Sequence, residues 1–371
     1  MANIKKIVCI SDIHCGGKHN LESLVNELNF FITWCKEYKP DIIFILGDLF
    51  DKKLIVGSPH DVVCRDFINS LLSLKCHIIY VNGTYTHDTN SINSYEKLIS
   101  DKFKIYKTVD SNYLDGLHML YIPEENHPNK EKYYEKFFLE GTQNKFDLIV
   151  GHGLLATVPF LDKIYKKGTK STKIIFFEDD FKNIINGCVV YGHYHIHLES
   201  RSGLLNYTGS FSRDSFGEDE PKGFMIIEYD TNQKKILKKE FIENTLAPIY
   251  KTVNAEKIQG DGEELFKSIE KIKKGTYSLR IIIDSDISDT RMQSFLAYSY
   301  GHPEVVIQKQ FRGLSKKQEE ERNNTLSEKR EKRHKLLERF RDLDFMTITQ
   351  IFAKERFNLD ISVDEIKELL K

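Results

Sequence analysis

Five short segments of the sequence carry side chains that bind metal ions well. Their ligand groups are carboxylates and imidazoles without a pair of thiolates, which suits manganese, iron, zinc or magnesium rather than an iron–sulfur cluster or a structural zinc. One bridging carboxylate with several imidazoles is typical of hydrolytic sites that hold two ions about 3.5–4 Å apart. The segments are Asp12-Ile13-His14, Gly47-Asp48-Leu49-Phe50-Asp51, Gly83-Thr84-Tyr85-Thr86-His87-Asp88, Gly151-His152-Gly153 and Gly192-His193-Tyr194-His195. Together they predict a site that activates water and neutralises charge on a phosphoryl group.

Each segment alone is weak evidence. An Asp-x-His or a Gly-Asp pair occurs often by chance, and the glycine and histidine at 151–152 are also compatible with a strand followed by a turn. His193 and His195 are more specific, because residues two apart on an extended strand point to the same side. The occurrence of all five segments in this order favours a metal site.

Strand-like runs precede these segments, and helical patterns separate several of the runs. The carboxyl ends of strands in an open α/β sheet are where ligands bind, so the five segments should converge on one site. Glycine ahead of the ligands in four segments lets the backbone turn sharply there. The expected strands cover 6–12, 41–47, 77–82, 117–122, 147–150 and 188–191, and the expected helices cover 20–38, 59–74, 91–100 and 128–140. This alternation predicts an α/β layered fold.

The pattern changes twice further along the chain. Residues 204–240 contain strand patterns only, which predicts a second sheet packed against the first. A strand, a helix and a strand over 277–307 then predict a small separate module. A charged stretch over 314–342 reads as a solvated linker or helix, and 343–371 regains amphipathic helical spacing, with Ile348, Ile351 and Phe352 on one face.

Composition excludes little but gives no sign of a membrane protein. The chain has 371 residues and a formal net charge of -1, so overall charge gives no argument for a nucleic-acid or membrane partner, and any basic surface must be local. The first residues of the sequence lead directly into a strand pattern, which predicts a cytoplasmic protein. The six cysteines are scattered, and we expect them to be reduced core residues.

The order of the five segments resembles that of the calcineurin-like metallophosphoesterase superfamily. The stretch after the last segment is similar to SbcD-type DNA double-strand-break repair nucleases of bacteria or bacteriophages. That similarity rests on Tyr207-Thr208-Gly209-Ser210, Arg213, Phe216-Gly217-Glu218 and Pro221-Lys222-Gly223-Phe224. The resemblance covers residues 5–230. It implies a two-sheet αββα sandwich over 1–245, a small α+β capping domain over 246–313 and a helical C-terminal segment.

The resemblance also implies roles for single residues. Two divalent ions, manganese or alternatively magnesium, would be bound. Asp12, His14 and His195 would bind one ion, His152 and His193 the other, and Asp48 both. His87 would lie near the scissile phosphate, where it stabilises the transition state or protonates the leaving oxygen. Asp88 would orient His87, and Asp51 would support the site.

The sequence departs from the family at the third segment. The usual loop is Gly-Asn-His-Asp, and its amide oxygen completes the shell of the second metal. Here the loop is two residues longer and the asparagine is absent. Thr86 takes its position, while Thr84, Asn82, a backbone carbonyl or water could replace it. We therefore expect a weaker or more exchangeable second ion.

The implied substrate is DNA, cut by exonuclease and endonuclease action together with a coiled-coil ATPase of the SMC type. Residues 343–371 would bind that ATPase, unless they pack on their own domain. Three lysines, Lys166, Lys167 and Lys170, are candidate contacts to the DNA backbone. Helices 20–38 and 59–74 would form a homodimer, through residues that could equally be core: Phe30, Phe31, Trp34, Phe67 and Leu71.

Two other functions fit the same sequence. One is a metallophosphoesterase of another branch that acts on a phosphoprotein or a nucleotide. The other is an assembly subunit whose altered loop has weakened catalysis and whose role lies in binding the ATPase.

Overall fold

The computed structural model describes residues 3–17, 20–125, 129–157, 174–260, 262–271, 277–284, 289–302, 304–310 and 362. Lys166, Lys167 and Lys170 lie outside these residues, as do the charged stretch and, apart from Ser362, the expected helical segment at 343–371. The described strands form two sheets of six strands, one of three and one of two.

The first six-stranded sheet has the order β14-β13-β1-β2-β3-β4. Its strands β1 to β4 run parallel, and a hairpin of β13 and β14 joins them antiparallel beside β1. The strands are β1 (Ile4–Ile10), β2 (Ile42–Leu46), β3 (His77–Val81), β4 (Phe103–Tyr106), β13 (Gly223–Asp230) and β14 (Lys235–Glu243).

The second six-stranded sheet has the order β11-β12-β10-β7-β6-β5, with a parallel centre. Its strands are β5 (Asp110–Leu114), β6 (Leu117–Ile122), β7 (Phe146–His152), β10 (Ile185–Gly192), β11 (Leu198–Glu199) and β12 (Leu205–Tyr207). A two-stranded sheet pairs β8 (Leu154–Leu155) with β9 (Ile175–Phe176).

This topology corrects the expectation that residues 204–240 form the second sheet. Only β12 of that stretch joins it, and β13 and β14 extend the first sheet instead. The reason is pairing over a long sequence distance: β13 lies antiparallel to β1, from Ile4 opposite Asp230 to Cys9 opposite Met225. Alternating hydrophobicity identifies a strand but does not name its neighbour.

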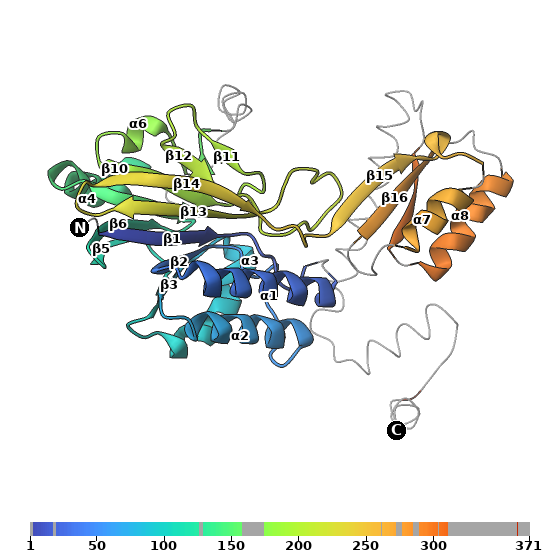
Figure 1. Cartoon of the computed structure of the whole chain (residues 1–371), viewed down its shortest axis with the longest axis horizontal. Helices are drawn as coiled ribbons and strands as arrows, with labels where there is room; N and C mark the ends of the chain where they lie inside the picture. The colour runs from blue at the N-terminus through green and yellow to red at the C-terminus, as the bar shows by residue number, and fades with distance from the viewer. Residues whose placement is uncertain are drawn as a thin grey trace. The chain divides into compact units, whose positions relative to one another are not determined.

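The two sheets pack face to face, and helices cover both outer faces (Figure 1). Helices α1 (Leu21–Tyr38) and α2 (Pro59–Leu72) pack on the first sheet, whereas α4 (Lys130–Gln143) and α6 (Glu178–Phe181) pack on the second. Side chains alternate along β1: Val8 and Ile10 face the helices, and Ile7 and Cys9 face the other sheet. The expected αββα sandwich is confirmed.

The N-termini of α1 and α2 are capped as their sequences indicate. Asn20 Oδ1 accepts a bond of 3.2 Å from Ser23 N, and Ser58 Oγ accepts one of 3.3 Å from Asp61 N ahead of the first-position Pro59. Such caps satisfy amides that lack a partner within the helix. Phe31 of α1 packs edge to face on Phe224 of the sheet.

Three of the five proposed dimer residues belong to the core. Phe31 of α1 and Phe67 and Leu71 of α2 are buried in the core cluster, and Phe30 and Trp34 are partly buried against the same cluster. All six cysteines are buried and free of disulfides, as expected.

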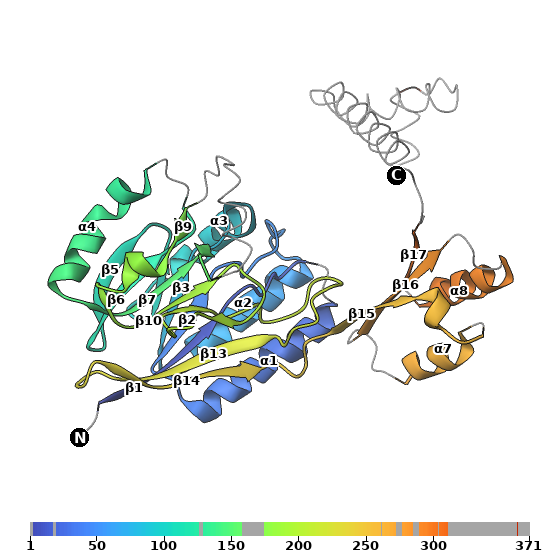
Figure 2. The same ribbon diagram turned by 90° about the horizontal axis from the view of Figure 1, so that it is seen from above.

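The strand and helix pattern near residue 280 belongs to a small unit with its own core (Figure 2). Its helices carry Phe266 and Phe295 onto Leu279 and Ile281 of a three-stranded sheet. The elements are β15 (Ile249–Asn254), η2 (Ala255–Lys257), α7 (Glu263–Ile269), β16 (Tyr277–Asp284), α8 (Asp289–Gly301) and β17 (Val305–Gln310). Within the described residues, no helix has the length and apolar character needed to cross a membrane.

Candidate metal centre

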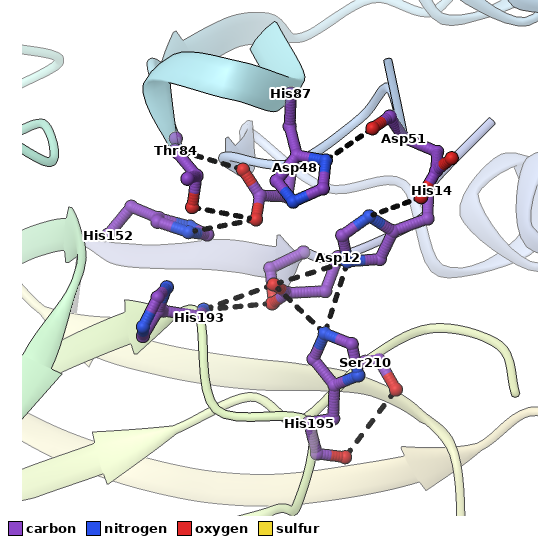
Figure 3. A network of polar contacts seen from close by, with 12 residues as sticks. Asp12, His14, Asp48, Asp51, Thr84, His87, His152, His193, His195 and Ser210 are labelled. Atoms are coloured by element: carbon purple, nitrogen blue, oxygen red, sulfur yellow. Dashed lines mark hydrogen bonds and ion pairs between the residues drawn. The ribbon is translucent and has the colours of Figure 1, made fainter. Parts of the chain in front are cut away.

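The five ligand-bearing segments meet at the carboxyl ends of β1, β2, β3, β7 and β10 (Figure 3). Their His and Asp atoms form three groups, and within each group the ligand atoms lie within 4.8 Å of one another. The groups are Asp12, His14 and His195; Asp48, His152 and His193; and His14, Asp51 and His87. Every residue that the resemblance assigns to metal binding is in one of these groups.

The first group gathers around Asp12. The Nε2 atoms of His14 and His195 are 3.1 Å apart, and Asp12 Oδ1 lies 3.9 Å from the first and 3.7 Å from the second. Asp12 is held in place by Ser11 Oγ, which donates to its Oδ2 at 2.6 Å, and by the amide of His193. Two imidazoles and a carboxylate in this arrangement fit a divalent cation.

The second group gathers around Asp48. His152 Nδ1 donates to the carbonyl of Leu46 at 2.7 Å, which turns Nε2 toward Asp48 Oδ2 at 3.3 Å. A bond from the far ring nitrogen to a carbonyl is the usual way in which a metal-binding histidine is oriented. Burial disfavours the charged form of Asp48, but His152, His14 and His87 outweigh it and lower the pKa of this carboxyl.

A buried ring nitrogen supports a cation in the second group. Among the described residues His152 Nε2 has no hydrogen-bond partner, and it faces Asp48 Oδ2 at 3.3 Å. A buried polar atom without a partner costs free energy unless a ligand satisfies it. The carboxylates also draw positive charge here: burial lowers the pKa of His152, yet Asp48, Asp12 and Glu124 raise it to about 10. The donor set therefore fits two divalent ions.

Backbone conformation aims these ligands. Asp12, His14, Asp48 and His193 all have positive φ, at 52°, 50°, 49° and 93°. Side chains rarely adopt this region, and such strain persists only where surrounding structure enforces it. Backbone bonds between the first two loops do so, since Asp12 N donates to Gly47 O at 3.1 Å and His14 N to Asp48 O at 3.0 Å.

Glycine at position 83 permits a close approach between two loops of the site. A Cβ atom there would lie 2.3 Å from Asp48 Oδ1 and 2.4 Å from Asp48 N. No side chain fits in that space, so the loops after β2 and β3 can come together only if residue 83 is glycine.

Most of the third segment forms helix rather than loop. Helix α3 (Tyr85–Ile92) begins inside the segment and is followed by η1 (Asn93–Leu98), so the helix expected over 91–100 starts earlier. Thr84 is the residue that reaches the ligands: its amide donates to Asp48 Oδ1 at 2.7 Å, and its Oγ1 is 3.1 Å from Asp48 Oδ2. Thr86 is exposed on the first helical turn, and no described contact joins it to the cluster.

His87 lies beside the first group. Its Nδ1 pairs with the carbonyl oxygen of Asp51, and its ring centroid is 5.0 Å from that of His14 (Figure 3). Because a carbonyl only accepts, Nδ1 carries the proton of this bond and leaves Nε2 to exchange a proton with another molecule.

Asp88 has partners other than the one expected. Its buried carboxylate accepts from the amides of Asp48 and Gly83, both at 2.8 Å, and no described contact joins it to His87. Burial, together with the charge of Asp48, raises its pKa to about 6. Asp88 thus fixes the loops after β2 and β3, and the Asp51 carbonyl orients His87.

Glu124 belongs to the site but was absent from the sequence-based set. It follows β6, and its Oε2 is 3.3 Å from His193 Nδ1, 3.7 Å from His152 Nε2 and 2.9 Å from Thr84 Oγ1, which donates to it. Burial opposes its ionisation, but His193, His152 and Thr84 lower the pKa of Glu124 to about 2. The sequence signal that points to this residue is an acid just beyond the strand pattern at 117–122.

The segment after the last ligands wraps around His195. Glu218 Oε1 lies 3.8 Å from His195 Nδ1, and buried Lys222 binds both Glu218 Oε2 at 2.8 Å and the His195 carbonyl at 2.9 Å. Arg213 Nε donates to the Glu218 carbonyl at 2.9 Å. Burial lowers the pKa of His195, but Glu218 and Asp12 raise it above its usual value.

Comparison with known proteins agrees with this geometry. The family model of the calcineurin-like phosphoesterases matches residues 5–197, the stretch that holds all five ligand segments. This chain belongs to that family. Calcineurin-like phosphoesterases bind divalent metals, and the His and Asp groups described above are the candidate ligands. The family supports a metal-dependent hydrolase.

Two curated relatives resemble more of the chain. The SbcD subunit of the nuclease SbcCD from Staphylococcus epidermidis is 22% identical over 321 residues, covering 78% of this chain and 82% of its own length. The protein of the same name from Staphylococcus saprophyticus is 24% identical over 299 residues, covering 72% and 75%. A solved dimetal phosphatase from Danio rerio is 11% identical and covers 60% of this chain and 92% of its own length, with a TM-score of 0.33.

Proposed function

We propose that this chain is the nuclease subunit of an SbcCD-like complex and hydrolyses DNA phosphodiester bonds with two divalent ions, manganese or magnesium. The observation that carries the proposal is the pair of ligand groups around Asp12 and Asp48, in a chain related over most of its length to proteins named as nuclease subunits. An SMC-type ATPase would be the partner and the cytoplasm the location.

In this proposal Asp12, His14 and His195 hold one ion, and His152 and His193 hold the other. Asp48 binds both ions in this proposal. Its carboxylate belongs to the second group, and the charge of His14, a residue of the first group, lowers its pKa. When bound, two such ions neutralise phosphoryl charge and make a water molecule nucleophilic near neutral pH.

His87 is the proton donor to the leaving oxygen in this proposal. The Asp51 carbonyl fixes its tautomer, and its ring contacts the first ligand group through His14. A positioned general acid contributes about 10²–10⁴-fold to rate.

His87→Gln is expected to lower the rate of DNA cleavage about 10²–10⁴-fold while both ions still bind, because glutamine cannot transfer a proton. Cleavage assays and manganese titration check the two parts. His77→Gln is the matched control: His77 begins β3, at the opposite end of that strand, and its ring pairs with the Asp101 carbonyl and Asp115. Unchanged cleavage in the His87 variant would contradict the role.

A nuclease assay on linear and hairpin DNA, with manganese or magnesium and with or without the partner ATPase, tests the function itself. Metal-dependent DNA cleavage is expected. Hydrolysis of small phosphoesters alone would favour another branch of the family, acting on a nucleotide or a phosphoprotein. Binding of the ATPase without any hydrolysis would favour the assembly subunit.

The C-terminal residues 343–371 are proposed to bind the ATPase as an amphipathic helical element. Deletion of 343–371 is expected to abolish capture of the ATPase while DNA cleavage by the isolated chain persists. Capture that survives the deletion would rule this role out. Lys166, Lys167 and Lys170 are proposed to contact DNA phosphates, which charge-removing substitutions test through the salt dependence of DNA binding.

A homodimer through α1 and α2 is part of the same proposal. Between the helices lies a groove of about 200 Å³ whose lining includes Val25, Ile32 and Val63. Phe30 and Trp34 remain partly accessible beside the core. Sedimentation equilibrium of the full chain tests this, and a monomer at micromolar concentration would contradict it.

A further inference from the structure

We infer that Glu124 is a direct ligand of the second ion and completes a set of four with Asp48, His152 and His193. The inference rests on the proposed two-ion function and deepens it. It assigns to this chain's own carboxylate the place that the third segment leaves without an asparagine.

Two of the three separations around the second group are those of atoms that share one ion, and the third is slightly longer. Metal–nitrogen and metal–oxygen bonds of roughly 2.0–2.2 Å place neighbouring ligand atoms roughly 3–3.6 Å apart, depending on the angle between the bonds. Around the second group the separations are 3.3 Å from Asp48 Oδ2 to His152 Nε2, 3.3 Å from His193 Nδ1 to Glu124 Oε2, and 3.7 Å from Glu124 Oε2 to His152 Nε2. The carboxylate oxygen therefore lies beside both imidazoles, close to the position that a fourth ligand would take.

Thr84 positions this carboxylate. Its Oγ1 lies 2.9 Å from Glu124 Oε2 and 3.1 Å from Asp48 Oδ2, so a single hydroxyl spans the two acids. The start of α3 at Tyr85 leaves Thr84 as the last residue before the helix, next to both carboxylates. The extra residues of the segment thus supply an orienting hydroxyl, and the end of β6 supplies the ligand.

Charge agrees with this assignment. Buried charges are stable when they are paired or bind metal, and the Glu124 side chain is 12% exposed beside two imidazoles. A carboxylate is also a stronger ligand for manganese or magnesium than the neutral oxygen of an amide or a hydroxyl. The second ion is then bound tightly, contrary to the weak binding expected from the sequence.

Glu124→Gln is expected to weaken binding of the second manganese ion by more than about 100-fold, beyond the roughly 10- to 100-fold loss that removal of an outer-shell partner causes, and to leave the first unchanged. Titration calorimetry and the electron paramagnetic resonance spectrum of manganese, which distinguishes a coupled pair of ions from a single one, measure this without any substrate. Thr84→Val is expected to give a smaller loss in the same direction, because it removes only the orienting hydroxyl. Glutamine keeps the shape of the side chain, so circular dichroism should be unchanged.

Glu125→Gln is the matched control. It removes the same charge one residue away, where the carboxylate instead accepts from Tyr133 Oη at 2.9 and 3.0 Å. Both ions should bind it as they bind the parent. If the parent binds two ions and Glu124→Gln binds both equally well, this inference is overturned and the proposed function stands. If the parent binds a single ion, the two-ion function itself fails.

Discussion

Asp48→Asn is expected to abolish metal-dependent phosphodiester cleavage, with kcat/KM lower by about 10³-fold or more. Asp48 is the acid of the second ligand group and the proposed bridge to the first, so its charge serves both ions. Asparagine keeps an oxygen that can accept from the Thr84 amide, now 2.7 Å from Asp48 Oδ1, but it supplies no negative charge. Cleavage of linear DNA with manganese measures the loss of activity, and manganese titration measures the loss of metal binding.

The backbone conformation at position 48 is compatible with asparagine. Asp48 has a φ of 49°, a conformation that asparagine tolerates better than most residues. Asp115→Asn is the matched control, because Asp115 has a φ of 52° and forms a partly exposed ion pair with Lys5. It should leave cleavage and metal binding intact. A cleavage rate for Asp48→Asn within tenfold of the parent would refute the shared role.

Glu27→Gln is expected to stabilise the protein by up to about 4 kcal/mol at pH 8 and by little at pH 4. Glu27 is fully buried on α1, where Asn244 Nδ2 donates to Oε2 at 2.8 Å and Ser23 Oγ to Oε1 at 3.4 Å. Burial raises its pKa to about 7, although Ser212, Asn244 and Ser23 and the charge of Arg213 lower it. The native state therefore holds this proton at pH values where the unfolded chain, with a pKa of about 4.3, has lost it.

The sign of the pH effect follows from that difference in bound protons. Between about pH 4.3 and pH 7 the native state binds more protons at Glu27, so its contribution to the free energy of unfolding falls as pH rises. Above pH 7 the native state bears the full free-energy cost of ionising the buried Glu27 carboxyl. Glutamine removes this cost because it carries no ionisable group. Urea denaturation of parent and variant at pH 5 and pH 8, at one fixed metal concentration, measures the difference. Glu37→Gln, exposed on the same helix, is the control, and equal pH dependence in parent and Glu27→Gln would overturn this account.

The ligand chemistry of the site could be predicted from local sequence. Asp12, His14, Asp48, His152, His193 and His195 each follow a short apolar strand or end it, and the rule that ligands bind at carboxyl ends of strands brings them to one edge. Strand period and ligand type are local properties, so no tertiary information was needed. An α/β layered fold followed in the same way from the alternation of strands and helices.

The contacts within the site could not be predicted in this way. Asp88 accepts from backbone amides of two loops rather than from His87, and Thr84 rather than Thr86 contacts Asp48, because α3 starts inside the third segment. The residue at which a helix starts depends on tertiary packing, and so does the choice between side chains a few residues apart as contact partners. The spacing of residues in the sequence does not specify either. The same holds for Phe31, Phe67 and Leu71, which the amphipathic pattern left open between core and interface and which packing places in the core.

By itself, therefore, the sequence determined which residue types end the strands, and with them a metal-dependent hydrolase of the calcineurin-like family. Only the tertiary structure decided which strands are neighbours: β13 and β14 beside β1, and β6 beside β7. The second pairing carries Glu124 to His152 and His193, residues that are distant in the sequence. Strand neighbours are selected by hydrogen bonding and burial across the whole chain, and a pattern of period two cannot specify them.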